Sequence, residues 1–128
     1  MPMDYKNAEG YSDPTPYLAL KSRFRPLVYI CSAYSGDVGG NTEKARRYSR
    51  FAVDEGAIPI APHLLFPQFL DEQRERELAM QMDLVLLKHC LEIWVFGRVT
   101  DGMSREIGLA ERRNMKIRYF NEDLEELE

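Results

Sequence analysis

Four short runs of strand-forming residues alternate with three segments of helix length, and this alternation is the feature that most restricts the possible folds. The strand-like runs occupy residues 27–32, 57–61, 92–96 and 116–120. Helices are expected over residues 42–55, 71–89 and 103–113. Each helix returns the chain to the same end of the sheet, so successive strands run parallel through right-handed crossovers. The pattern therefore predicts an α/β fold with a parallel, doubly wound sheet.

The chain of 128 residues is long enough for one globular domain and too short for two. We expect an N-terminal arm or lid over residues 1–26, the α/β domain over 27–120 and an acidic tail over 121–128. The tail, NEDLEELE, holds five acids and no base, so the rest of the chain is near neutral although the net charge is −4. Without a basic stripe, a nucleic-acid polymer is not an expected partner. A single nucleotide is compatible with this charge.

The two cysteines and the hydropathy of the chain bear on its compartment. Cys31 and Cys90 lie in or beside apolar segments without the spacing of a disulfide framework or a zinc site, which favours buried thiols in a reducing compartment. No apolar run approaches the roughly 20 residues that span a bilayer, and the polar start of the chain lacks a signal-peptide core. We expect a cytoplasmic protein that does not contact the membrane.

The segment LEIWVFGRVTDGMSREIGLA passes from an apolar strand through a glycine-containing loop into a helix with Glu106 in its first turn. In open α/β sheets, ligands bind where the carboxyl ends of the strands meet the following loops. Glu106 is therefore a candidate catalytic residue, and Gly102, Met103 and Ser104 are candidate substrate-binding residues. The alternative is an acid that only stabilises the helix start, by about 0.3–1 kcal/mol.

Asp83 is the one acid within the apolar stretch MQMDLVLLKHC. An ionised carboxylate on a packing face needs a partner or a function. Together with Glu106 it would form two carboxyl groups in a cleft, the arrangement that breaks glycosidic bonds through a nucleophile and an acid/base. The alternative is that Asp83 faces solvent on an amphipathic helix.

The loop CSAYSGDVGGN after the first strand supplies the remaining candidates. The ring of Tyr34 could flank a base or sugar, while Ser32 and Asp37 could bind sugar hydroxyls or a phosphate, and Gly36 would let a ligand approach the backbone. The loop lacks the GK[ST] ending of a Walker loop and a full GxGxxG. Alternatively these are turn residues followed by a helix cap at Asn41 or Thr42.

Neither a metal ion nor a cofactor is expected from the sequence. His63 and His89 are far apart and lack the acidic or thiol neighbours of a metal site. Both histidines are expected to serve as surface or hydrogen-bonding residues.

Three segments, YICSAYSGD, DLVLLKHCLEIWVFG and GMSREIGLA, resemble the nucleoside 2-deoxyribosyltransferase-like superfamily, which includes the 2'-deoxynucleoside 5'-phosphate N-hydrolases. The resemblance covers most of residues 27–120. It implies a flavodoxin-like or Rossmann-like three-layer fold of four to five strands, and Glu106 as the nucleophile that attacks the anomeric carbon of a deoxyribosyl group. It further implies that Asp83 positions the sugar and manages the proton of the leaving base, that Tyr34 lies near the sugar, and that Ser104 lies near the 5' end.

The resemblance also implies a small-molecule nucleoside or nucleotide substrate, no cofactor, and a homodimer or higher homo-oligomer. One position departs from it: superfamily members often carry an aspartate just before the third strand, where this chain has Leu91. We expect cleavage or transfer of the N-glycosidic bond of a deoxynucleoside or its 5'-monophosphate. The alternatives are a nucleotide-sensing module without catalysis, which Leu91 motivates, and a purely structural domain.

Overall fold

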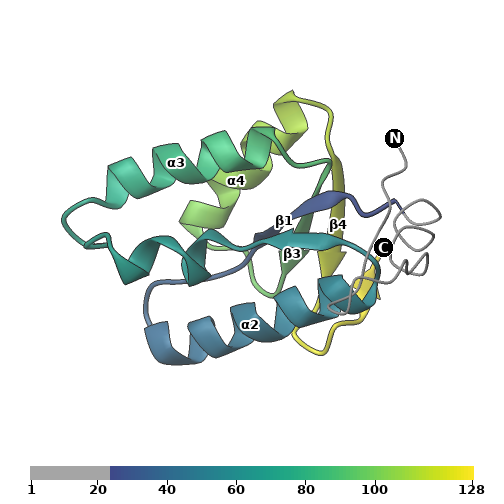
Figure 1. Cartoon of the computed structure of the whole chain (residues 1–128), viewed down its shortest axis with the longest axis horizontal. Helices are drawn as coiled ribbons and strands as arrows, with labels where there is room; N and C mark the ends of the chain where they lie inside the picture. The colour runs from purple at the N-terminus through teal and green to yellow at the C-terminus, as the bar shows by residue number, and fades with distance from the viewer. Residues whose placement is uncertain (1–23) are drawn as a thin grey trace, which may run out of the picture.

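A computed structural model describes residues 24–128 as a five-stranded sheet covered by helices (Figure 1). The strands are β1 (Leu27–Cys31), β2 (Ile58–Ile60), β3 (Glu92–Phe96), β4 (Lys116–Phe120) and β5 (Glu126–Leu127). The helices are α2 (Val38–Asp54), α3 (Arg76–Lys88) and α4 (Asp101–Arg112), with 3₁₀ turns η1 (Pro62–Leu64) and η2 (Phe66–Gln68). Most of the expected N-terminal arm lies outside the described residues. No helix within 24–128 combines the length and apolar character that crossing a membrane requires.

The sheet has the strand order β2-β1-β3-β4-β5, and β1 to β4 run parallel. This arrangement confirms the predicted α/β class and doubly wound sheet, and its order is that of flavodoxin-like folds. The fifth strand falls within residues 121–128, which we expected to form a tail. It runs antiparallel to β4, with Phe120 opposite Glu126, and Glu126 binds Arg118 at 2.7 Å. Cross-strand charge pairing thus favours folding the acidic end back onto the sheet.

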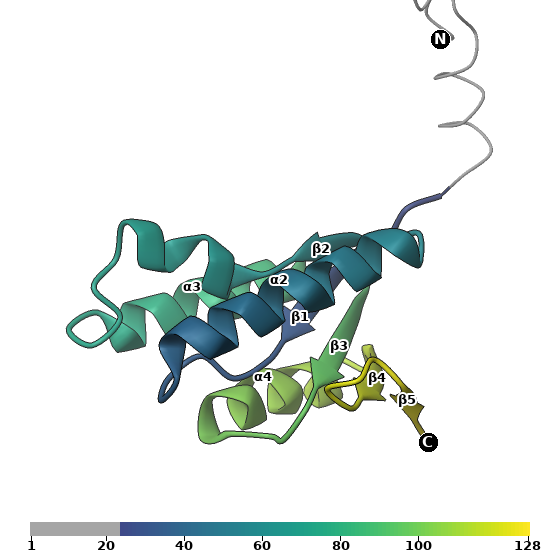
Figure 2. The same ribbon diagram turned by 90° about the horizontal axis from the view of Figure 1, so that it is seen from below.

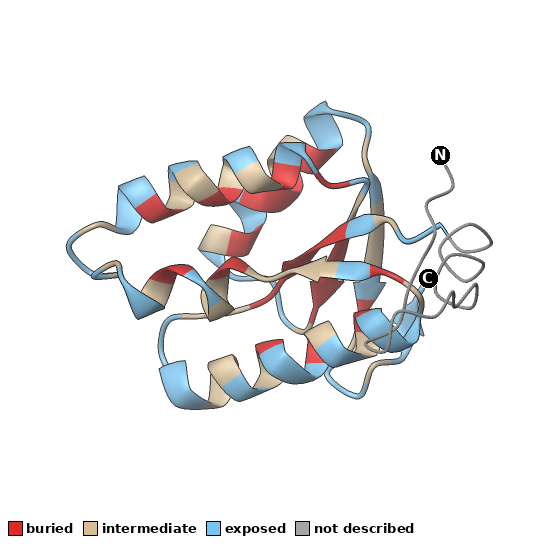
Figure 3. Ribbon diagram, viewed as in Figure 1, coloured by how far each residue is buried: buried red, intermediate tan, exposed pale blue. Residues whose placement is uncertain are grey.

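Two helical layers enclose the sheet, with α2 on one face and α3 and α4 on the other (Figure 1). Figure 2 is seen from the side of α2 and shows the strands following one another from β2 to β5. The alternation of side chains along β1 explains how both faces are filled. Val28 and Ile30 pack with Tyr48 of α2, whereas Tyr29 and Cys31 belong to the cluster that contains residues of α3 and α4. Figure 3 shows buried residues along the central strands and on the helix faces directed at them. The Tyr29 side chain therefore lies on the face of the sheet that α3 and α4 cover.

The start of α2 differs from the sequence-based expectation. The helix begins at Val38, and the Asp37 side chain caps it by accepting a hydrogen bond of 3.1 Å from the Gly40 amide. The predicted cap at Asn41 or Thr42 is therefore wrong. Asn41 instead donates its side-chain amide to the carbonyl oxygens of Tyr34 and Ser35, so it holds the loop that precedes the helix.

The buried side of α3 is not formed by its large apolar residues alone. Ala79, Asp83 and Leu87 face the interior at a spacing of four residues, while Leu78 and Val85 are exposed. The stripe that contacts the sheet thus includes a carboxyl group. Since β1 lies between β2 and β3, the chain order reverses beside β1, and the loops after β1 and β3 meet at one edge. Ligands of doubly wound sheets bind at such a switch point.

Candidate active site

A hollow of about 270 Å³ opens at the carboxyl edge of the sheet, between the loop after β1, η1, α3 and the start of α4. Six of the nine site residues predicted from the sequence line it: Glu106, Asp83, Tyr34, Ser32, Gly102 and Met103. These residues come from three separate segments of the chain. The fold therefore brings together polar groups that the sequence could only place near one edge.

Three predicted residues do not line this hollow. Asp37 caps α2, which is the structural alternative considered for it. Gly36 has a φ of 92°, in the left-handed region that favours glycine, and it lies in the exposed loop ahead of α2. Ser104 is exposed on α4, where its amide bonds to the carbonyl oxygen of Thr100.

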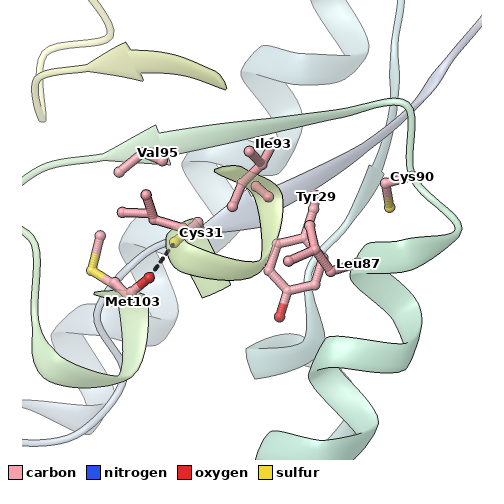
Figure 4. Packing of buried hydrophobic residues seen from close by; sticks show 9 residues of the cluster. Tyr29, Cys31, Leu87, Cys90, Ile93, Val95 and Met103 are labelled. Atoms are coloured by element: carbon pink, nitrogen blue, oxygen red, sulfur yellow. Dashed lines mark hydrogen bonds between the residues drawn. The ribbon is translucent and has the colours of Figure 1, made fainter. Parts of the chain in front are cut away.

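The carboxyl group of Glu106 is held by two donors from the neighbouring strand. Glu106 is only 2% exposed. The Tyr29 hydroxyl donates a hydrogen bond to its Oε2 at 2.5 Å, and the Cys31 thiol lies 3.3 Å from its Oε1. Tyr29 and Cys31 point to the same side because they are two residues apart on β1, and Figure 4 shows both on that side, with Leu87 of α3 close by. Both oxygens of the carboxyl group are thus oriented.

The first turn of α4 sets the position of Glu106. Gly97 follows β3 and has a φ of 77°, and the Thr100 side chain then caps α4 by accepting a hydrogen bond of 3.4 Å from the Met103 amide. Met103 packs in the same cluster as Cys31, whose thiol approaches the Met103 carbonyl oxygen (Figure 4). The capped, buried start of this helix keeps Glu106 directed at β1.

Burial raises the pKa of Glu106 to about 7, although the hydrogen bonds from Tyr29 and Cys31 act in the opposite direction. Burial, followed by the nearby Glu106 charge, also holds the pKa of Tyr29 and of Cys31 well above their ordinary values. Both groups therefore keep their protons and remain donors. Two donors directed at one carboxyl group favour its ionised form.

Asp83 lines the same hollow, but its surroundings differ from those of Glu106. Burial, the Glu106 charge and the Glu72 charge raise its pKa to about 8. Asp83 has no equivalent of the Tyr29 and Cys31 donors among the hydrogen bonds of residues 24–128. The two donors favour the carboxylate form of Glu106, and burial without such donors favours the carboxylic acid form of Asp83, so Glu106 loses its proton first. A pair of carboxyl groups separated in this way can act as nucleophile and proton donor.

The raised pKa of Asp83 makes a prediction about stability. Between its ordinary value of 3.8 and about 8, the folded protein holds a proton that the unfolded chain has lost. The free energy of unfolding should therefore fall as the pH rises through this window, and Asp83→Asn should flatten that decline. From pH 5 to pH 8 we expect the difference between wild type and variant to change by about 1 kcal/mol or more. Urea titrations at several pH values measure it, with exposed Asp54→Asn as control. Parallel curves would contradict the prediction.

The mouth of the hollow carries two rings and a buried hydroxyl. The rings of Tyr34 and His63 lie 5.0 Å apart at 32° to one another. His63 Nε2 lies 3.0 Å from the Ser32 carbonyl oxygen, and burial lowers the pKa of His63, so the neutral ring donates from this nitrogen. Ser32 is 3% exposed and its Oγ has no partner within the described part of the chain. A planar ligand can contact the rings while a ligand hydroxyl satisfies Ser32.

Several lining residues were missed by the sequence analysis. The sequence analysis expected His63 only to form a hydrogen bond or to face solvent. It treated Tyr29 only as part of the first strand. Strand alternation puts Tyr29 and Cys31 on one face, but only the packing of α4 shows that this face meets Glu106. Glu72 and Arg76 also line the hollow, and the sequence offered no stronger signal for them than a charged helix face.

Leu91, the departure from the superfamily pattern, lies away from this site. Its amide bonds to the Leu27 carbonyl oxygen at the amino end of β1, and its side chain is 55% exposed. The hollow lies at the opposite, carboxyl edge of the sheet. A missing aspartate at this position therefore removes no group from the hollow. Within residues 24–128, no group of three or more potential metal ligands comes together.

Comparisons with known proteins identify a family and a shared fold. Residues 26–120 match the family model described as "Domain of unknown function (DUF7768)". No curated protein matches the chain. A solved structure of a 2-deoxyribosyltransferase from the psychrotolerant bacterium Bacillus psychrosaccharolyticus is similar, with a TM-score of 0.57 and 17% sequence identity. The alignment covers 74% of this chain and 72% of that one. At this identity, the likeness shows a common fold.

Proposed function

This chain belongs to the DUF7768 family, and we propose that it cleaves or transfers the N-glycosidic bond of a deoxynucleoside or deoxynucleoside 5'-monophosphate. The observation that carries the proposal is the pair of buried carboxyl groups in one hollow, of which Glu106 alone is bound by two donors. The likeness to a 2-deoxyribosyltransferase supports it by showing the same fold. Retaining enzymes of this chemical class use two carboxyl groups with distinct roles.

Glu106 is the proposed nucleophile. Its carboxylate attacks the anomeric carbon, C1', and the bond between C1' and the base nitrogen breaks with its electron pair going to the base. The product is a covalent glycosyl ester on Glu106. Tyr29 and Cys31 orient the carboxylate and favour its ionised form against the effect of burial. Burial leaves it poorly solvated, so less water has to be displaced before it attacks.

Asp83 is the proposed acid. Because its pKa is about 8, it holds a proton that it can donate to the departing base. In the second half of the reaction, the Asp83 carboxylate takes a proton from the acceptor as the acceptor attacks C1' and releases Glu106. Water as acceptor gives hydrolysis, and a second base gives transfer. The rings of Tyr34 and His63 would contact the base at the mouth of the hollow.

Base release tests the proposal directly. The four common deoxynucleosides and their 5'-monophosphates are incubated with the protein, with and without a different free base as acceptor, and the products are separated by chromatography. Release without an acceptor indicates a hydrolase, and a new nucleoside indicates a transferase. If no substrate in the panel releases its base while some raise the melting temperature, the protein is a nucleotide-binding module and the catalytic proposal is wrong.

Tyr29→Phe should lower kcat by about 10- to 100-fold, because a hydrogen bond to a charged group is worth roughly 1.5–3 kcal/mol. Loss of this donor also raises the pKa of Glu106 further, so the acidic limb of the pH–rate profile should move to higher pH. Steady-state rates from pH 5 to 9 measure both effects. Tyr119→Phe on β4 is the matched control. An unshifted limb would mean that Tyr29 serves packing alone.

We extend the proposal to the state in which the protein works. The superfamily resemblance implies a homodimer or higher homo-oligomer that acts on a small molecule. The cysteines and hydropathy of the chain support a place in the cytoplasm, and its charge argues against a nucleic-acid polymer as partner. The apolar side chains of Leu78 and Val85 are exposed on α3, the helix that carries Asp83. Exposed apolar side chains on a helix of the candidate site support self-association at that helix.

A further inference from the structure

Glu72 is the acid in the turn before α3 that the local backbone does not use. Asp71 accepts hydrogen bonds from the Gln73 and Arg74 amides at 3.0 and 3.2 Å. Glu75 accepts a hydrogen bond from the Asp71 amide at 3.0 Å, and its own amide donates to the Asp71 carbonyl oxygen. The Oε2 atom of Glu72, by contrast, is buried and has no hydrogen-bond partner in the described part of the chain. Glu72 is therefore available to a ligand.

Arg76 is a second unpaired group in the wall of the candidate active site. Among the described residues, its guanidinium is the one that lines the hollow, together with the carboxyl groups of Glu72, Asp83, Asp101 and Glu106. None of the ion pairs found within residues 24–128 involves Arg76. A buried acceptor and a nearby donor that both lack partners indicate a ligand that supplies donors and an acceptor.

The wall that carries Glu72 and Arg76 borders a second hollow, of about 380 Å³, beside the loop after β1. Tyr34, Ser35, Glu72 and Arg76 line both hollows, so the two adjoin. The first hollow, of about 270 Å³, falls short of the roughly 300 Å³ at which small-molecule sites begin. A ligand whose sugar lies beside Glu106 can therefore extend past Tyr34 toward the second hollow.

Glu72 lies close to both groups that the proposed function assigns to the leaving base. Burial and then the Glu72 charge raise the pKa of Tyr34, whose ring would contact the base. The Glu72 charge also adds to burial and the Glu106 charge in raising the pKa of Asp83, the proposed acid. Ser32, which is 3% exposed and has an unpartnered Oγ, lines the same hollow and independently indicates a ligand there. The edge of a base held in this way is within reach of Glu72.

We propose that Glu72 and Arg76 recognise the base of the substrate and that they select guanine. The Watson–Crick edge of guanine carries two adjacent N–H donors, on N1 and on the 2-amino group, next to the acceptor O6. The Glu72 carboxylate can accept from both donors while Arg76 donates to O6. Adenine and cytosine place a ring acceptor next to their amino group, and thymine flanks its single N–H with two carbonyl oxygens. This inference rests on the proposed function for the position of the base.

The surroundings of Glu72 favour a ligand with N–H donors. Burial raises the pKa of Glu72, and the nearby Arg76 charge acts in the opposite direction. Two N–H donors from guanine would favour the ionised carboxylate and supply the missing hydrogen bond to its buried oxygen. A neutral Glu72 would instead offer one donor and one acceptor, which matches adenine or cytosine. A measured preference for either of those bases would contradict the inference.

The test compares binding of deoxyguanosine, deoxyinosine and deoxyadenosine, with the three 5'-monophosphates measured in parallel. Calorimetry uses the full chain carrying Glu106→Gln, so that turnover does not interfere. We expect deoxyguanosine to bind about tenfold more tightly than deoxyadenosine or better, as one additional hydrogen bond to a charged group allows. Deoxyinosine keeps N1–H and O6 but lacks the 2-amino group, and it should bind with intermediate affinity.

Two added substitutions assign the preference to the proposed residues. Glu72→Gln should reduce the ratio of deoxyguanosine to deoxyadenosine affinity to within about threefold, because an amide offers one donor and one acceptor. Arg76→Ala should weaken binding of deoxyguanosine and deoxyinosine, which both carry O6, by about threefold or more while leaving deoxyadenosine unchanged. Glu77→Gln and Arg74→Ala are the matched controls, since they remove the same charges from exposed positions near the start of α3 outside both hollows.

The outcomes separate this inference from the proposed function. Equal affinity for deoxyguanosine and deoxyadenosine, or an equal loss of preference in Glu77→Gln and Glu72→Gln, would overturn the inference even if base is released. Failure of every ligand to bind would overturn it as well. A guanine preference that depends on Glu72, without base release by the wild type, would instead contradict the proposed function alone.

Discussion

The Glu106→Gln variant is expected to lose base release by about 10⁴-fold or more, the largest effect of any single change in this protein. Glutamine keeps the shape of the side chain and an oxygen that can accept from Tyr29, but its amide is too weak a nucleophile to form the glycosyl ester. Loss of a nucleophile typically removes nearly all enzymatic rate enhancement. The fold should persist because the buried carboxyl group is replaced by a neutral group of the same size.

Base release from the best substrate in the panel, compared between wild type and variant, measures this effect. Glu111→Gln is the control, since Glu111 lies on the same helix and is exposed. Circular dichroism and melting temperature establish that both variants fold. Rapid quenching and mass spectrometry of the wild type should show a deoxyribosyl adduct on the peptide that contains Glu106. Undiminished release from Glu106→Gln would exclude this residue as the nucleophile.

Asp83→Asn should slow base release by about 10²- to 10⁴-fold, the range typical of general acid catalysis. Asparagine has the size of aspartate and cannot donate an acidic proton to the leaving base. The wild-type rate should rise with pH as Glu106 ionises near 7 and fall as Asp83 ionises near 8. The variant should lose the alkaline decline and keep the acidic rise.

The leaving group distinguishes an acid from a packing residue. A 7-methylguanine deoxynucleotide already carries a positive charge on its base and needs little protonation to depart. Asp83→Asn should therefore retain more of the wild-type rate on this substrate than on the unmethylated one. Glu106→Gln should lose both activities equally, because the nucleophile is needed whatever the leaving group is. An equal loss on both substrates in Asp83→Asn would assign Asp83 to positioning rather than to proton transfer.

The order of elements could be predicted from the chain with little error. Two of the expected strands, 92–96 and 116–120, have the observed bounds, because β-branched and aromatic runs between turn residues are a local signal. The start of α2 could not be placed, because Asp37, Asn41 and Thr42 are all suitable caps and the choice depends on where the loop is held. Strand β5 was not expected, since two residues beside a bend carry no period of their own.

The sequence by itself determined the parallel sheet and the edge at which a site forms, because period, turn residues and connection order are local properties. It also indicated Glu106, which follows a strand at that edge, and Asp83, because a carboxyl group in an apolar segment is costly. Only the tertiary structure decided that Tyr29 and Cys31 hold Glu106, that Asp83 shares its hollow, and that the Ser32 hydroxyl is buried in the wall of that hollow. These contacts join residues that are distant in sequence. Whether such residues meet depends on which face of each strand and helix packs against the core.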